Sequence, residues 1–267
     1  MSPVAQRKLC IFCGKPGTTK EHVFPAWLRG VVPTEGKNHS YFQTHTVPGR
    51  VGSDPAIVTV PKVIVRSGHS YSRTVKRVCR PCNTGWMSRL QEQAKLVLVP
   101  LILGGGSVLS FDEQNLLATW ITMTAMVAEY TDVDHIGISA AQRRDFYRDP
   151  SYQPDWTIWI GRYAGDQWNY RYRHNGVRFG LRPPASPGSD GLAQWSTFVI
   201  GSLLIHCFSS TNLTLLQTGI LPSPGLFQIP YRTGDAIDYS TLLTLSDEDA
   251  DFLSGEALHI FARSNEL

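Results

Sequence analysis

The chain has 267 residues, of which 42% are hydrophobic and 18% are charged, so a wholly disordered protein is excluded and a hydrophobic core needs no disulfide bonds. Residues 1–95 carry 15 Lys/Arg against 4 Asp/Glu, whereas the remainder is acidic, which the overall net charge of +3 conceals. A basic N-terminal third suits a surface that binds phosphates, although a loop-rich segment with many surface Lys and Arg accounts for it equally well.

Two segments of the basic third have the composition of β-strands, residues 39–46 and 56–65. The Pro-Gly pair at 48–49 and the stretch 52–55, which is bounded by Gly and Pro, predict turns between them.

A helix is predicted from residue 83, because apolar side chains recur at spacings of four, four and three: Trp86, Leu90, Ala94 and Val97. Pro100 and the glycines 104–106 are expected to end it. Ser110 followed by Glu113 is a capping-box pattern. It predicts a second helix, amphipathic and running to about Thr131, and a shorter helix is expected over 140–148.

From about residue 156 the pattern is that of β-structure. Segments 156–163 and 168–173 form a candidate hairpin, and Asn175-Gly176 is a second hairpin signal that leads into 177–181. A loop is expected over 183–191, and two strands are expected over 197–208 and 213–216. A last short helix is expected to begin at Ser246.

Four of the five cysteines fall into two C-x-x-C pairs. The first residues lack the apolar stretch of a secretion signal, and in such a chain this spacing favours metal thiolates over disulfides. Two pairs supply the four soft ligands of a tetrahedral structural zinc. We therefore predict one zinc ion bound by Cys10, Cys13, Cys79 and Cys82. The fifth cysteine, Cys207, lies in an apolar strand pattern and is expected to be an unreactive core thiol.

The segments CIFCGKPGTTKEHVFPAWL and VCRPCNTGWMSRL resemble HNH endonucleases of the four-cysteine zinc type, which belong to the ββα-metal superfamily. The resemblance covers roughly residues 8–95. It implies that Glu21 and His22 lie on a β-hairpin, that Asn83 lies at the start of a helix, and that a divalent ion is bound between them.

The residue types suit phosphodiester hydrolysis. His22 is the expected general base, because the unperturbed pKa of histidine lies near neutral pH. Glu21 and the amide oxygen of Asn83 are the implied ligands of Mg²⁺ or Mn²⁺, which prefer oxygen. The family commonly has an Asn nine residues before the final ligand that orients the catalytic His, and this chain has Thr74 there. Thr74 can take only part of that role, which leaves a backbone carbonyl as the other candidate.

Two simpler interpretations stay open for these residues. Glu21 and His22 are compatible with an ordinary surface pair, and Asn83 suits the N-cap of the helix that follows it. Basic residues around the second cysteine pair are candidate contacts to phosphates, with largely sequence-independent and salt-sensitive binding: Arg73, Lys76, Arg77, Arg80 and Arg89.

We therefore expect an α+β protein with an N-terminal zinc-stabilised ββα-metal (HNH) module over 1–95. A helical segment and a strand-rich C-terminal region of unknown role, 96–267, follow it. The expected function is metal-dependent endonucleolytic cleavage of DNA, with RNA also possible. A homodimer is possible, because cutting both strands with one metal centre per chain would usually need two copies. The alternatives are a catalytically inactive nucleic-acid-binding module and a protein-interaction module. The longest apolar run, Leu96–Leu103, is too short for a membrane span, so a cytoplasmic location is expected.

Overall fold

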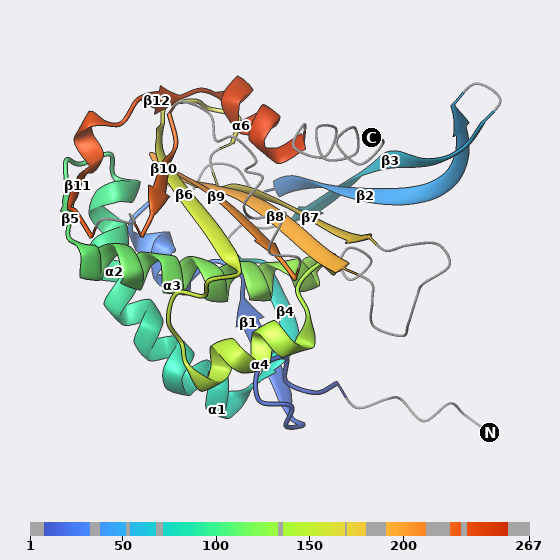
Figure 1. The fold of residues 1–267 in the computed structure, drawn as a ribbon, viewed down its shortest axis with the longest axis horizontal. Coiled ribbons are helices and arrows are strands. Elements are labelled where there is room, and N and C mark those ends of the chain that lie inside the picture. The colour runs from blue at the N-terminus through green and yellow to red at the C-terminus, as the bar shows by residue number, and fades with distance from the viewer. Residues whose placement is uncertain are drawn as a thin grey trace.

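The computed structural model describes residues 8–32, 38–51, 54–67, 72–132, 136–168, 170–179, 191–211, 225–230 and 234–255. Helices and strands are both present, so the fold is α+β, as predicted. A long central helix, α3 (Phe111–Ala128), contacts a mixed sheet as well as α2 (Ser88–Ile102) and the strand β4 (Thr74–Cys79) (Figure 1).

The N-terminal strand β1 (Thr18–His22) pairs antiparallel with β4. A short 3-10 helix, η1 (Ala26–Gly30), follows β1. The chain then forms β2 (Asn38–Val51) and β3 (Asp54–Ser67), a long antiparallel ribbon that projects from the rest of the molecule (Figure 1). The predicted strands 39–46 and 56–65 are confirmed. The predicted turn at 48–49 is wrong, because β2 continues through it in register with β3.

Three helical pieces follow β4 without interruption: α1 (Arg80–Cys82), the π-helical turn η3 (Asn83–Met87) and α2. The predicted helix is thus confirmed. Pro100 does not end it, since it lies inside the last turn of α2, which stops at Ile102 just before Gly104 at φ +73°. Pro100 lacks the N–H that would donate to the Leu96 carbonyl, so it removes one hydrogen bond of α2 without ending the helix.

The α3 helix follows the two-residue strand β5 (Val108–Leu109) and continues as η4 (Glu129–Thr131). Its capping box is confirmed: the Glu113 N–H donates to Ser110 Oγ (3.3 Å), and the Ser110 N–H donates to Glu113 Oε2 (2.8 Å). The predicted amphipathic face is wrong, because every residue from Leu117 to the end of α3 is buried. This part of the helix lies between the sheet on one side and α2 and β4 on others, which leaves residues 117–128 no solvent face.

The large sheet has the order β10-β6-β9-β8-β7, and β12 pairs in parallel with the end of β6. Its strands are β6 (Trp156–Tyr163), β7 (Arg171–Phe179), β8 (Gly191–Ile200), β9 (Leu203–Ser210), β10 (Phe227–Ile229) and β12 (Thr244–Leu245). The predicted hairpin of 156–163 with 168–173 is wrong, since β6 pairs with β9 and β10 instead. The predicted turn at Asn175-Gly176 is also wrong, because β7 runs straight through it.

The single strand predicted over 197–208 is two strands that reverse at Gly201 (φ +57°). Alternate residues on β8 and β9 face opposite sides of the sheet: Phe198 and Ile205 join the core that contains α3, whereas Val199 and Leu204 pack with the last helix, α6 (Asp247–Gly255). The helix predicted from Ser246 is therefore confirmed. Helix α4 (Ala140–Arg148) is confirmed as well, and β11 (Ile237–Asp238) with η6 (Tyr239–Thr241) completes the described elements.

The predicted strand 213–216 and all but the last residue of the predicted loop 183–191 lie outside the described residues. The expected boundary after residue 95 falls inside α2, and one hydrophobic core contains buried side chains from both sides of it. None of the helices in the described ranges has both the length and the apolar composition needed to cross a bilayer.

Candidate metal centre and catalytic site

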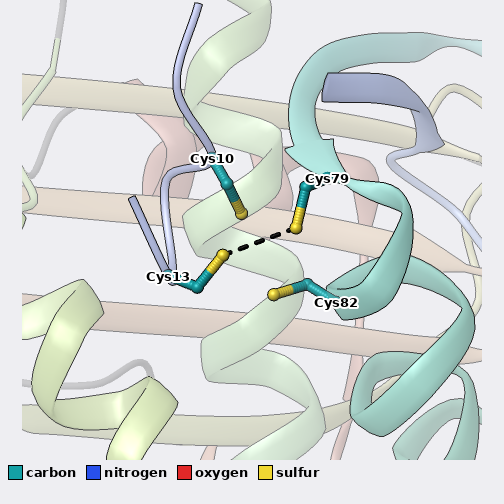
Figure 2. Close-up of side chains that lie close together, drawn as sticks. All are labelled: Cys10, Cys13, Cys79 and Cys82. Carbon is teal, nitrogen blue, oxygen red and sulfur yellow. Dashed lines mark hydrogen bonds between the residues drawn. The ribbon is translucent and has the colours of Figure 1, made fainter. Parts of the chain in front are cut away.

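The two cysteine pairs meet at one end of the β1/β4 hairpin. Cys10 and Cys13 lie in the turn before β1, Cys79 ends β4, and Cys82 ends α1 (Figure 2). Their four sulfur atoms lie within 4.8 Å of one another, and Cys13 Sγ is 3.4 Å from Cys79 Sγ. Four thiolates around a tetrahedral zinc at about 2.3 Å would lie about 3.8 Å apart. The four cysteines are therefore placed to bind a metal ion such as zinc.

Backbone hydrogen bonds fold the first pair into a tight turn. The Gly14 N–H donates to the Cys10 carbonyl (3.0 Å), and the Cys10 N–H donates to the Lys15 carbonyl (2.9 Å). Gly14 has a φ of +72°, a left-handed conformation that a residue without Cβ adopts readily. The Ile11 N–H donates to the Arg77 carbonyl (3.0 Å), which holds this turn against β4 beside the second pair.

Three of the four cysteine thiols are shielded from solvent, which affects their protonation. Cys10, Cys79 and Cys82 are buried, and Cys13 is partly exposed. Burial is the largest cause of the raised pKa values of Cys79 and Cys82, so without a metal these two thiols retain their protons at neutral pH. A zinc ion would displace those protons and supply the charge that stabilises the thiolates. The chemistry of the donor set therefore fits zinc.

The register of the hairpin places the other predicted site residues relative to the cysteines. Thr18 pairs with Cys79 near the sulfur cluster, and His22 pairs with Thr74 at the opposite end. A bulge between Thr19 and Glu21 shifts the register by one residue. Two antiparallel strands followed by a helix thus bring residues 21, 22 and 83 into one small unit.

Asn83 is fastened to β1 by its side chain. Its Nδ2 donates to the Lys20 carbonyl (3.2 Å) and to Thr19 Oγ1 (3.4 Å), and the Thr19 hydroxyl itself donates to the Val78 carbonyl (3.1 Å). Because both partners act as acceptors, the amide nitrogen faces β1 and the amide oxygen faces away. The alternative N-cap role of Asn83 is wrong, since its backbone is helical and its side chain does not cap a helix.

Glu21 is a buried carboxyl group beneath α2. Only 5% of its surface is exposed, and Gln91 Nε2 donates to its Oε1 at 3.3 Å. Burial raises the pKa of Glu21 to about 7, and the hydrogen bond from Gln91 offsets this in part. In the described part of the chain no Lys, Arg or His forms an ion pair with it. A divalent cation would compensate such a buried charge, so the residue fits the predicted role of ligand.

His22 is half-buried on the strand end that faces Thr74. Burial lowers the pKa of its imidazole, and the nearby positive charge of Arg29 lowers it further. The ring is therefore neutral at pH 7 and has a lone pair available to accept a proton. Among the described residues no hydrogen bond to the ring is found.

The five predicted phosphate contacts fall into two groups. Lys76, Arg80 and Arg89 are exposed. Arg73 donates to the Thr131 carbonyl (3.0 Å) and lies 5.8 Å from the centre of the Tyr172 ring, whereas Arg77 lies 5.0 Å from the centre of the Tyr130 ring. The second group is thus engaged within the protein, where it connects β4 to the C-terminal region.

Sequence reasoning missed a buried polar network beside this contact. Arg143 on α4 forms an ion pair with Glu129 at the end of α3 and lies 4.9 Å from the centre of the Tyr130 ring, on which Arg77 also lies. Glu129 also accepts hydrogen bonds from the N–H groups of Gly137 (2.5 Å) and Ile138 (2.8 Å). Glu129 follows an apolar helix, and a charged residue at such a position is the sequence signal that could have indicated this network.

Gln91 was missed as well, and no sequence signal separates it from the exposed Gln93 two positions later.

Within the described ranges, the four cysteines are the one set of three or more Cys, His, Asp or Glu side chains placed to surround an ion. Comparisons with protein-family models, curated proteins and solved structures find no match to this chain.

Proposed function

We propose that the protein is a metal-dependent phosphodiester hydrolase that cleaves DNA internally. The observation that carries this proposal is that Glu21, His22 and Asn83 all lie on one strand-strand-helix unit, which also brings four cysteine thiols together. Asn83 is far from Glu21 and His22 in the sequence but is hydrogen-bonded to the same strand, and an ordinary surface pair would not require Glu21 to be buried.

His22 would remove a proton from the attacking water. The water oxygen then bonds to phosphorus as the bond to the 3′ oxygen breaks, and that oxygen takes up a proton. The products are a 5′-phosphate and a 3′-hydroxyl, as in the family that the sequence resembles. Glu21 and Asn83 would hold a Mg²⁺ or Mn²⁺ ion, which supplies positive charge to the developing oxyanion and leaving group.

The exposed residues Lys76, Arg80 and Arg89 would contact backbone phosphates. Such contacts predict affinity that falls steeply with salt and depends little on sequence. The net charge of the first 95 residues, +11 by count, supports the same expectation.

A second candidate is a zinc-dependent nucleic-acid-binding module without catalysis. It is favoured by Thr74, which stands opposite His22 where the resembling family commonly has an Asn. A histidine that is not held in one orientation makes a poor general base. This candidate predicts salt-sensitive DNA binding without cleavage.

The test is cleavage of supercoiled plasmid by the purified zinc-loaded protein with Mg²⁺, Mn²⁺ or EDTA, beside His22→Ala. We expect metal-dependent nicking or linearisation that His22→Ala lowers by at least about a hundredfold, within the range of general-base contributions. Zinc content and circular dichroism of the variant serve as controls. Equal cleavage by the variant contradicts the proposal, and binding without cleavage by the wild type favours the second candidate.

Two further arms address the substrate and the oligomeric state. A labelled RNA run in parallel tests the other nucleic acid. Linear product formed in one binding event would indicate two copies, because one centre cuts one strand at a time, and sedimentation at the same concentration would then show a dimer.

A further inference from the structure

We infer that Gln91 is a positioning residue that holds Glu21 in the orientation needed to bind the divalent cation. The inference rests on the proposed function, since it concerns the metal ligand of that site. Gln91 itself is not expected to touch the cation or the nucleic acid.

The hydrogen bond between Gln91 and Glu21 joins helix α2 to strand β1. Gln91 lies on α2, between the buried residues Leu90 and Ala94, and its Nε2 donates to Glu21 Oε1 at 3.3 Å. Glu21 is 5% exposed, and within the described residues this is the hydrogen bond found for its carboxyl group. The side chain of Gln91 therefore decides which way the carboxyl group faces.

The direction of the bond leaves the right atoms available. The nitrogen of Gln91 faces Glu21 Oε1, so the second carboxyl oxygen stays free for another partner. Asn83 is oriented in the same sense, because its nitrogen is bonded to β1 at Lys20 and Thr19 while its oxygen faces away. Both amides thus use their nitrogens on the protein, and the second oxygen of Glu21 and the amide oxygen of Asn83 remain to bind a hard cation.

A neutral donor suits this position for an electrostatic reason. A Lys or Arg in place of Gln91 would neutralise the buried carboxylate and repel an incoming cation. An amide fixes the carboxylate by a hydrogen bond and leaves its negative charge uncompensated. Mutation of a residue that orients a metal ligand in this way typically weakens metal binding by about ten- to a hundredfold.

The experiment is a titration of the zinc-loaded full chain with Mn²⁺, in which free Mn²⁺ is followed by electron paramagnetic resonance. We expect one Mn²⁺ bound by the wild type and its loss in Glu21→Gln. Gln91→Leu, which has nearly the same size without the donor, should raise the dissociation constant about ten- to a hundredfold. Gln93→Leu, on the same helix but exposed, is the matched control and should bind as the wild type does.

Gln91→Lys separates positioning from a merely structural role. It keeps a donor to Glu21 and replaces the hydrogen bond by an ion pair, so its unfolding midpoint should stay at or above that of the wild type. Its Mn²⁺ affinity should nevertheless fall as far as that of Gln91→Leu. This variant carries the test if Gln91→Leu fails to fold.

Wild-type affinity in both Gln91 variants overturns the inference and leaves the proposed function standing. A wild type that binds no Mn²⁺, or a Glu21→Gln variant that still binds it, overturns the inference together with the metal ligands of the proposed function.

Discussion

His22 and Thr74 lie directly opposite each other on β1 and β4, although a long insertion separates them in the chain. Cross-strand partners in an antiparallel pair share one face of the sheet and have side chains within contact range. Position 74 is therefore the place from which a side chain on β4 can orient the imidazole. The threonine hydroxyl is one bond closer to the backbone than the oxygen of a side-chain amide, and it is a weaker acceptor. It is therefore poorly placed to accept a hydrogen bond from the imidazole ring.

Replacing Thr74 by Asn should raise the rate of cleavage by up to about tenfold, the lower end of what orienting partners contribute. The added carbonyl oxygen can accept a hydrogen bond from the ring and hold the other nitrogen toward the water. The measurement is kcat for plasmid nicking over a range of pH. Thr74→Val, which removes the hydroxyl at nearly constant volume, is the control and should lower kcat. A folded Thr74→Asn variant that is no faster argues against this orientation of the site.

His206 is a buried histidine outside the site. It is fully enclosed between strands, its Nδ1 lies 2.9 Å from Thr197 Oγ1, and burial lowers its pKa from 6.5 to about 4. Between those two pH values the unfolded chain binds more protons than the folded one, so stability rises with pH across this window and is lost as pH falls.

Wild-type protein should therefore lose on the order of 3 kcal/mol of unfolding free energy through His206 between pH 6.5 and pH 4. His206→Gln, which cannot take up a proton, should lose less over the same window. Urea unfolding at several pH values measures both. The effect of acid on the four cysteine thiols is common to both proteins, so it cancels when the two plots of unfolding free energy against pH are compared. Parallel plots would contradict the role given to His206.

At the scale of elements, the starts of capped helices were predictable and strand partners were not. Ser110 and Ser139 both form capping boxes with the residue three positions later, because capping requires only residues adjacent in sequence. The pairing of β6 with β9 depends on segments some fifty residues apart. An Asn-Gly pair on β7 suggested a turn, but pairing with β8 along its whole length is more stable than reversing the chain there.

Ser110→Ala should destabilise the protein by about 1 kcal/mol, the usual loss for removing an N-cap side chain. The cap matters here because α3 is the central helix of the core and Gln114, in its first turn, is fully buried. Chemical unfolding measures the difference in free energy. Ser88→Ala is the matched control, since Ser88 is exposed where η3 passes into α2 and no hydrogen bond of its side chain is found among the described residues, and it should be neutral.

Across the whole molecule, the cysteines of the candidate metal centre and the C-terminal sheet belong to one hydrophobic core. Phe12 beside Cys13 packs against Trp86 with ring centres 5.1 Å apart, and Trp86 packs against Phe146 of α4 at 5.8 Å. A loss of order at the cysteines is thereby transmitted to the C-terminal region.

Removal of zinc by a chelator should therefore lower the midpoint of thermal unfolding by more than about 10 °C, in a single transition. Each kcal/mol lost shifts the midpoint of a domain of this size by about 2–4 °C, and structural zinc contributes several kcal/mol. Differential scanning calorimetry with metal analysis provides the measurement. Cys82→Ser should start at the lower midpoint and respond no further to chelator. An unchanged midpoint in metal-free protein would contradict this coupling.

The sequence by itself determined the features that depend on local spacing. The two C-x-x-C pairs indicated a shared metal site, because two intervening residues let both sulfurs of a pair face one ion, and the four thiols do lie together. The helices from residue 83, from Ser110 and over 140–148 followed from apolar periodicity and capping residues, which act within a few turns of the chain.

The tertiary structure decided the features that depend on contact between distant segments. It selected Gln91 over Gln93 as the partner of Glu21 and engaged Arg73 and Arg77 with the C-terminal region, leaving Lys76, Arg80 and Arg89 exposed. It also buried α3 on every side from Leu117 to Ala128. Burial and the choice of hydrogen-bond partner are properties of the packed chain, since they are set by surfaces that meet only after folding.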